Sequence, residues 1–113
     1  MVASASHDDT VRLWDAKTGE LDATLSGHDG PVNALAFSHN GRLLGTAGND
    51  HVAKVWDLAS DKEILKLGNH TDSINDIVFS PDGATLATSG DDGTVRIWKL
   101  APIELQEPLA PKK

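Results

Sequence analysis

Residues 27 to 58 read GHDGPVNALAFSHNGRLLGTAGNDHVAKVWDL, and residues 69 to 100, which begin 42 positions later, read NHTDSINDIVFSPDGATLATSGDDGTVRIWKL. Eleven of these 32 paired positions are identical. Trp14, Trp56 and Trp98 extend the same 42-residue interval to the N-terminal part of the chain. A repeat of this length is one supersecondary unit that buries its faces only by stacking against its neighbours. The function must therefore be interpreted for the array as a whole.

Each copy consists of short β-type runs separated by turn-forming residues. Val32–Phe37 and Ile74–Phe79 are followed by Asn40-Gly41 and Asp82-Gly83, which tolerate positive φ and predict hairpins. The same pattern predicts further strands at 21–25, 43–48, 53–57, 63–67, 85–90 and 95–99. No helical periodicity competes with this interpretation, so the sequence predicts an all-β protein.

Composition excludes several classes of partner and site. The net charge of −7 and the pI near 5.0 disfavour binding to nucleic acid or to an anionic membrane, and favour basic or neutral partners. The absence of cysteine excludes disulfides and thiolate metal sites. No apolar run approaches the roughly 18 residues of a membrane span, and we expect a cytoplasmic protein.

Three features resemble the WD40 repeat of β-propellers. They are Gly27-His28 near the start of a copy, Trp56-Asp57 near its end, and the Phe-Ser-Pro-Asp-Gly turn at 79–83. The resemblance covers residues 1 to 100 and implies blades of four antiparallel strands, of which the chain supplies fewer than three. It implies the C-terminal part of a repeat at 1–26 (strands b, c and d of a first blade), a complete repeat at 27–68, a repeat through Trp98 at 69–100, and a Pro-rich tail at 101–113. The tail is either an edge strand or disordered.

The family pattern also implies a buried hydrogen-bond tetrad. It maps onto His28, Thr46, Asp50 and Trp56, again onto His70, Thr88, Asp92 and Trp98, and incompletely onto Ser4, Asp8 and Trp14. Its physical logic is that a hydroxyl accepts the indole N–H and an imidazole connects that hydroxyl to a carboxylate, so that no buried polar atom is unpaired. Asn69 and Lys99 depart from the family's glycine and aspartate at their positions.

Catalytic and metal-binding interpretations are weaker. The His, Thr and Asp of each tetrad resemble parts of a hydrolytic triad, but they occur in two copies and each is tied to a tryptophan, which favours a structural role. His7, His39 and His51 lack the close pairing of a metal site, and Asp91-Asp92-Gly93 lacks the spaced ligands of a calcium loop. A basic residue two positions before each tryptophan is interpreted as packing along the sheet. We therefore expect no enzyme, no cofactor and no metal.

In proteins that this sequence resembles, partners usually dock on the end of the propeller formed by the loops joining strand four to one and strand two to three. The corresponding candidates here are His7, Pro31, Asn33, Asn49, Ser73, Asn75 and Asp91. Their polar character suits hydrogen bonds to a peptide, although ordinary solvated turn residues would look the same.

The sequence therefore predicts a non-catalytic protein-interaction scaffold. The alternative is a regulatory or sensing C-terminal module of a larger signalling enzyme, a kinase or nucleotide hydrolase, whose catalytic domain lies outside this chain. Direct enzymatic activity is a third and weaker hypothesis. Fewer than three blades leave apolar faces and strand edges uncovered. Either the remaining blades belong to a longer parent chain, of which this is a fragment, or copies of the chain associate to close the ring.

Overall fold

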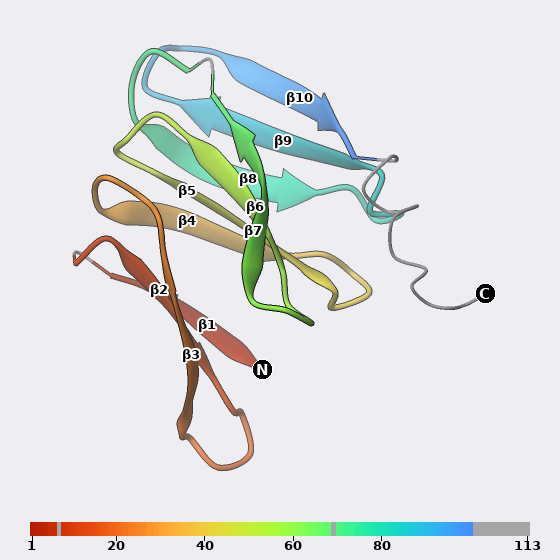
Figure 1. Ribbon diagram of the computed structural model, residues 1–113. Coiled ribbons are helices and arrows are strands. Elements are labelled where there is room, and N and C mark those ends of the chain that lie inside the picture. The colour runs from red at the N-terminus through yellow and green to blue at the C-terminus, as the bar shows by residue number, and fades with distance from the viewer. Residues whose placement is uncertain (7, 69, 101–113) are drawn as a thin grey trace.

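The computed structural model describes residues 1–6, 8–68 and 70–100, and every regular element within them is a β-strand (Figure 1). The strands form three antiparallel sheets, which we call sheet 1 (β1-β2-β3), sheet 2 (β4-β5-β6-β7) and sheet 3 (β10-β9-β8). Their bounds are β1 Val2–Ala5, β2 Thr10–Trp14, β3 Leu21–Ser26, β4 Val32–Phe37, β5 Leu43–Gly48, β6 Ala53–Asp57, β7 Lys62–Leu67, β8 Ile74–Phe79, β9 Thr85–Gly90 and β10 Val95–Lys99. The strand bounds predicted from the sequence agree with the observed bounds to within one residue. The tail at 101–113, with its suggested edge strand, lies outside the described residues.

The turns repeat with the same period as the strands. Asp9, His51 and Gly93, each 42 positions from the next, all have left-handed backbone, with φ values of 74°, 71° and 79°. Gly41 and Gly83 have φ values of 74° and 73° at the tips of the β4–β5 and β8–β9 hairpins. Left-handed backbone at fixed positions closes each pair of strands tightly, which is why the turn residues alone predict the hairpins.

The sheets stack face to face and enclose two separate cores. Val11, Leu13 and Leu25 of sheet 1 pack with Leu44 and Trp56 of sheet 2. The second core lies between sheets 2 and 3 and contains Leu43, Ala47, Ala53, Val55, Ile74, Ile77, Phe79, Leu86 and Leu100. Burial of each large aliphatic or aromatic side chain contributes about 1.5 to 3 kcal/mol. The stability of each sheet therefore depends on its neighbour.

Gly45 in β5 allows sheet 3 to approach sheet 2 closely. A Cβ atom at this position would lie 2.9 Å from Ile77 Cδ1 and 3.2 Å from Phe79 Cε2. Such short separations would force the neighbouring side chains to move. The contact between the two sheets therefore requires glycine at this point of β5.

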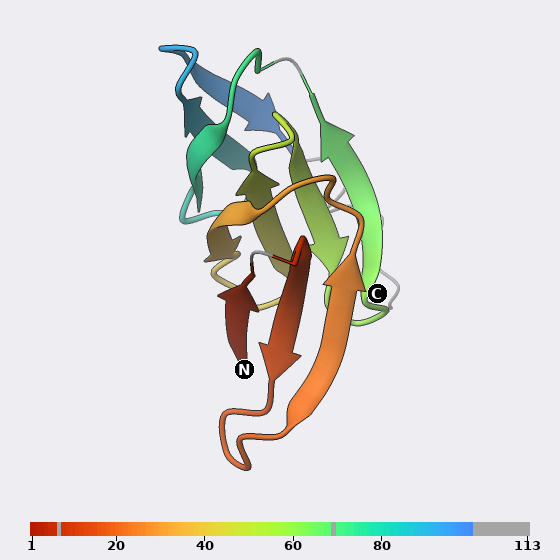
Figure 2. The same ribbon diagram turned by 90° about the vertical axis from the view of Figure 1, so that its left-hand side faces the viewer.

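The outer face of sheet 3 is uncovered within the described residues. Val78, Val95 and Ile97 on this face are 57%, 68% and 64% exposed. Ala53 and Val55, which stand 42 positions before Val95 and Ile97, are fully buried against sheet 3. The same face of the repeat is thus buried in one sheet and open in the next. The described residues form an all-β fold of three stacked sheets without a closed ring, which is that of an incomplete propeller (Figures 1 and 2).

The connections between strands fall alternately at two ends of the stack because the strands run antiparallel. One end, toward the left in Figure 1, carries the β1–β2, β3–β4, β5–β6, β7–β8 and β9–β10 connections, and we call it the loop face. The opposite end carries the β2–β3, β4–β5, β6–β7 and β8–β9 connections, and we call it the hairpin end. The described part of the chain holds no helix long and apolar enough to cross a membrane.

Candidate interaction face and its buried hydrogen-bond networks

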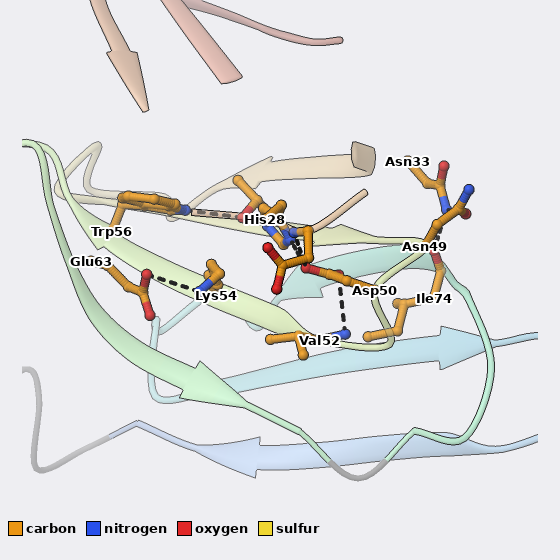
Figure 3. Close-up of polar contacts among 11 residues, drawn as sticks. His28, Asn33, Asn49, Asp50, Val52, Lys54, Trp56, Glu63 and Ile74 are labelled. Carbon is orange, nitrogen blue, oxygen red and sulfur yellow. Dashed lines mark hydrogen bonds and ion pairs between the residues drawn. The ribbon is translucent and has the colours of Figure 1, made fainter. Parts of the chain in front are cut away.

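A buried hydrogen-bond network connects sheet 2 to its loops (Figure 3). Trp56 Nε1 donates to Thr46 Oγ1 at 2.9 Å, and the same hydroxyl lies 2.7 Å from His28 Nε2. His28 Nδ1 lies 2.9 Å from Asp50 Oδ2, and the Asp29 amide donates to that carboxylate oxygen at 3.0 Å. The network thereby ties the β3–β4 connection to the β5–β6 turn.

The directions of these hydrogen bonds follow from the donors available. Thr46 Oγ1 accepts from the indole, so its own proton can be donated to His28 Nε2. His28 then carries its proton on Nδ1 and donates it to Asp50. Thr46 is completely buried and His28 nearly so. Because each buried polar group has a partner, burial of the network leaves no desolvation penalty uncompensated.

The second network repeats the first in sheet 3 and adds one member. His70 lies 2.9 Å from Asp92 Oδ2 and 2.8 Å from Thr88 Oγ1, and Trp98 Nε1 donates to Thr88 at 3.2 Å. Thr94 Oγ1 also donates to Asp92 Oδ1 at 2.7 Å. Sequence reasoning missed Thr94. Its signal was the threonine at position 10, which occupies the same place in the first copy, whereas position 52 is a valine.

In sheet 1 the partial network divides into two pieces. Trp14 Nε1 donates to Ser4 Oγ at 3.0 Å, and Asp8 instead accepts from the Thr10 hydroxyl at 2.6 Å and from Arg12 at 3.0 Å. Asp8 thus closes its own turn rather than joining Ser4 and Trp14 among the described residues. In sheets 2 and 3 a histidine, His28 or His70, lies between the hydroxyl and the aspartate and connects them.

The aspartates of these networks are stabilised in their charged form. Burial raises the pKa of Asp50, but hydrogen bonds from the Asp29 amide and from His28 outweigh it and hold the pKa below its usual value. The Thr94 hydroxyl, followed by the Thr71 amide, holds the pKa of Asp92 far below its usual range. The Thr10 and Ser6 hydroxyls lower the pKa of Asp8 to about 2. All three groups are therefore carboxylates at neutral pH.

The loop face brings the candidate partner-binding residues together in pairs. Asn33 Nδ2 donates to Asn49 Oδ1 at 2.8 Å, and Asn75 Nδ2 donates to Asp91 Oδ1 at 2.6 Å. All four side chains are exposed. Each pair joins the start of one strand to the turn that follows the next strand, and the two pairs stand 42 positions apart. His7, the remaining candidate of this kind, lies outside the described residues.

Backbone hydrogen bonds position these pairs. The Asn49 amide donates to the Pro31 carbonyl at 3.0 Å, and the Asp91 amide donates to the Ser73 carbonyl at 2.8 Å. Pro31 and Ser73 are thus placed at the loop face as backbone acceptors, with their side chains half-buried.

Asn33 also connects two sheets. Its Nδ2 donates to the Ile74 carbonyl of β8 at 3.0 Å, in addition to its bond to Asn49 (Figure 3). Both protons of the amide are therefore used, which fixes the orientation of the side chain. The loop face is thus continuous from sheet 2 to sheet 3.

The basic position before the tryptophan differs between copies. Lys54 is 5% exposed, and its Nζ lies 2.9 Å from Glu63 Oε1 in β7 (Figure 3). The stem packs along the sheet as expected, but the charge is held in an ion pair instead of lying in water. Arg12 pairs with Asp8 at the surface. Within the described residues, the cations at positions 12 and 54 are therefore both paired with carboxylates and do not form a shared row of free charges.

The described residues contain no group of three or more histidine or acidic side chains placed to hold a metal ion. His39 and His51 are exposed turn residues, and His28 and His70 are bound within their networks. Each of these two histidines faces a hydroxyl that already accepts an indole proton. A buried hydroxyl in this arrangement is poorly placed to act as a nucleophile on a substrate from solvent.

Comparison with known families identifies the repeat directly. The family model described as WD domain, G-beta repeat, of the WD40 family matches residues 1–15, 19–57 and 61–99.

Known proteins match the chain over about one repeat length. The WD40 repeat-containing protein HOS15 of Arabidopsis thaliana is 51% identical over 43 residues, which is 38% of this chain and 7% of that protein. The nuclear distribution protein PAC1 of Mycosarcoma maydis is 51% identical over 43 residues, 38% of this chain and 10% of that protein. The human F-box-like/WD repeat-containing protein TBL1Y is 52% identical over 42 residues, 37% of this chain and 8% of that protein. The matches thus span a tenth or less of these relatives.

Proposed function

The chain belongs to the WD40 repeat family, and membership of this family favours a role in protein–protein interaction. We propose that the chain is a non-catalytic scaffold that binds another polypeptide through its loop face. The observation that carries this proposal is the repeated pairing of Asn33 with Asn49 and of Asn75 with Asp91. Exposed amides held in fixed orientation are suited to recognise a peptide backbone, since little side-chain entropy is lost on binding.

Each pair retains unused hydrogen-bonding capacity. Among the described residues, Asn33 Oδ1 and Asp91 Oδ2 have no side-chain donor, and Asn49 Nδ2 has no acceptor. An extended peptide offers alternating N–H and C=O groups of the kind that these atoms can bind. The loop face therefore provides both donors and acceptors.

Charge restricts the class of partner. Asp29, Asp72 and Asp91 are exposed at the loop face, and the chain as a whole carries a net charge of −7. We propose a basic or neutral polypeptide, because an acidic partner would be repelled during approach. Binding of a basic peptide should weaken as the salt concentration rises.

We further propose that the His-Thr-Asp-Trp networks support this face and do not catalyse a reaction. They fix the β3–β4 connection, which leads to Asn33 at the start of β4, and the β5–β6 turn, which carries Asn49, since His28 and Asp50 lie in these two connections. Variants of the networks should therefore lose stability and binding together, whereas variants of the exposed pairs should lose binding alone.

Selection from a displayed library of random short peptides, with the immobilised full chain as target, tests the proposal. Replacing Asn75 and Asp91 by alanine should weaken the selected peptides at least tenfold and leave the circular dichroism spectrum unchanged. The matched control replaces Lys17 and Thr18, exposed residues of the β2–β3 connection, and should bind as the parent does. Equal loss in the control, or full binding by the loop-face variant, would reject the loop face as the site.

A further inference from the structure

Two hairpin tips meet at the hairpin end of sheets 2 and 3. They are the β4–β5 tip at residues 38–42 and the β8–β9 tip at residues 80–84. Sheets 2 and 3 contact each other chiefly through β4 and β8, which brings the two tips together (Figure 1). A cavity of about 280 Å³ lies between the tips, and we call it the hairpin-end notch. Its lining residues are His39, Asn40, Pro81, Asp82 and Gly83.

The two tips are the same turn, held by the same hydrogen bonds. In the first, Ser38 Oγ donates to Asn40 Oδ1 at 2.7 Å, and the backbone amide two positions after Asn40 donates to the same oxygen at 2.9 Å. In the second, Ser80 Oγ donates to Asp82 Oδ1 at 2.6 Å, and the corresponding amide donates to that oxygen at 2.9 Å. Two donors on one oxygen fix the orientation of each side chain, so little side-chain entropy is lost when a ligand binds.

Each oriented side chain keeps one atom available, and the two available atoms have opposite chemistry. Among the described residues, neither Asn40 Nδ2 nor Asp82 Oδ2 has a hydrogen-bond partner. The first is a donor and the second is an acceptor. Hydrogen bonds from the Ser80 hydroxyl and the Ala84 amide hold the pKa of Asp82 below its usual value, so the acceptor is a charged carboxylate at neutral pH.

The other lining residues suit a flat cation. His39 and Pro81 stand 42 positions apart, directly before Asn40 and Asp82, and both are exposed. Their rings offer surfaces on which a planar guanidinium packs better than a compact, strongly hydrated ammonium. A guanidinium has only donors, so it complements the Asp82 carboxylate but not the Asn40 amide nitrogen. The amide nitrogen requires a carbonyl oxygen, which the backbone of the same arginine residue supplies.

We propose that the hairpin-end notch binds an arginine residue of a polypeptide partner. The guanidinium pairs with Asp82 Oδ2 and packs against His39 and Pro81, and a backbone carbonyl of the arginine accepts from Asn40 Nδ2. The notch lies at the opposite end of the stack from the loop face, and the inference does not rest on the proposed function. One residue with two polar contacts should bind with a dissociation constant on the order of 1 mM. Binding of this strength is below what peptide selection recovers, so the notch is tested with a small probe.

The probe is Nα-acetyl-arginine N-methylamide, which carries the guanidinium and two backbone carbonyls but no charged terminus. In an NMR titration of the isotopically labelled full chain, it should shift the amides of residues 39–42 and 82–84 in a saturable manner. The citrulline analogue has nearly the same shape without the charge, and should bind about fivefold more weakly because it cannot form the ion pair. The lysine analogue should also bind more weakly, because its ammonium is not planar and is more strongly hydrated.

Two variants with the same change of charge complete the test. Asp82→Asn should keep the turn, because Asn40 makes the same two hydrogen bonds in the other tip, and should weaken binding of the probe about fivefold. Asp61→Asn alters an exposed residue of the β6–β7 connection, outside the notch, and should leave binding unchanged. The proposal is overturned if the probe does not bind, or if its shifts lie outside the two tips. It is also overturned if either analogue binds as tightly as the probe, or if the two variants weaken binding equally.

Discussion

Replacing Thr46 with valine removes the hydroxyl that joins Trp56 to His28 without creating a cavity, since the two side chains have nearly the same shape. Trp56 Nε1 and His28 Nε2 would both lose their partner in a buried site. Each unpaired buried group costs about 1 to 3 kcal/mol, so the loss of two partners by Thr46→Val should destabilise the fold by about 2 to 6 kcal/mol.

Two variants calibrate this expectation. Thr46→Ser keeps the hydroxyl and removes one methyl group, which should cost about 1 kcal/mol. Ser4→Ala removes a hydroxyl that, among the described residues, accepts from Trp14 alone in a half-buried site, and should cost about 0.5 to 1.5 kcal/mol. The order of destabilisation should therefore place Thr46→Val well above the other two.

Urea unfolding followed by circular dichroism measures all three variants, with ammonium sulfate added equally if a variant is too unstable to give a folded baseline. A double-mutant cycle with Trp56→Phe separates the coupling between the two residues from the cost of each change. The reasoning would be refuted if Thr46→Val changed stability by less than about 0.5 kcal/mol, the range of a neutral surface substitution. It would also be refuted if Thr46→Ser cost more than Thr46→Val.

Three further predictions concern other parts of the molecule. Gly48→Ala would place a Cβ 2.6 Å from the Pro31 carbonyl oxygen, so urea unfolding should show a loss of about 1 to 3 kcal/mol in stability. Gly68→Ala is the control, because open space surrounds this position and the change should be nearly neutral. Equal effects of the two substitutions would contradict the close approach at Gly48. The pKa of Asp92 is lower in the folded than in the unfolded chain, so the contribution of Asp92 to stability is present at neutral pH and is lost as the pH falls below about 4. The unfolding free energy of Asp92→Asn should therefore fall less steeply with decreasing pH than that of the parent chain. An unchanged slope would exclude Asp92 as a cause of acid destabilisation. Val95→Lys on the open face of sheet 3 should reduce self-association in light scattering, and undiminished association would assign it to another surface.

The repeat made most of the fold predictable because its strands and turns are specified locally. Gly41 and Gly83 lie at positive φ where the hairpins turn, so their positions in the sequence locate the strands on either side. The tetrad residues were assigned from the resemblance to the WD40 repeat, and each recurs 42 positions later with its tryptophan. Asn33 and Asn49 were assigned to one end of the repeat from the family resemblance, but their direct hydrogen bond had no sequence signal.

Features that depend on neighbouring sheets were not predictable. Phe37 and Phe79 are the same residue in the same motif, yet one is exposed and the other buried. Phe79 is buried where β4 packs along β8, whereas among the described residues no strand packs along β4 in the same way. The ion pair between Lys54 and Glu63 could not be predicted from the repeat either, because leucine stands at the equivalent position 21 of the first copy.

Mapping a selected peptide on the isotopically labelled chain by NMR tests the central claim most directly. The account predicts that chemical-shift changes concentrate at the amides of Asn33, Asn49, Asn75 and Asp91, and that the hairpin end is unaffected. Changes concentrated at the hairpin end, with the loop face unaltered, would contradict the account.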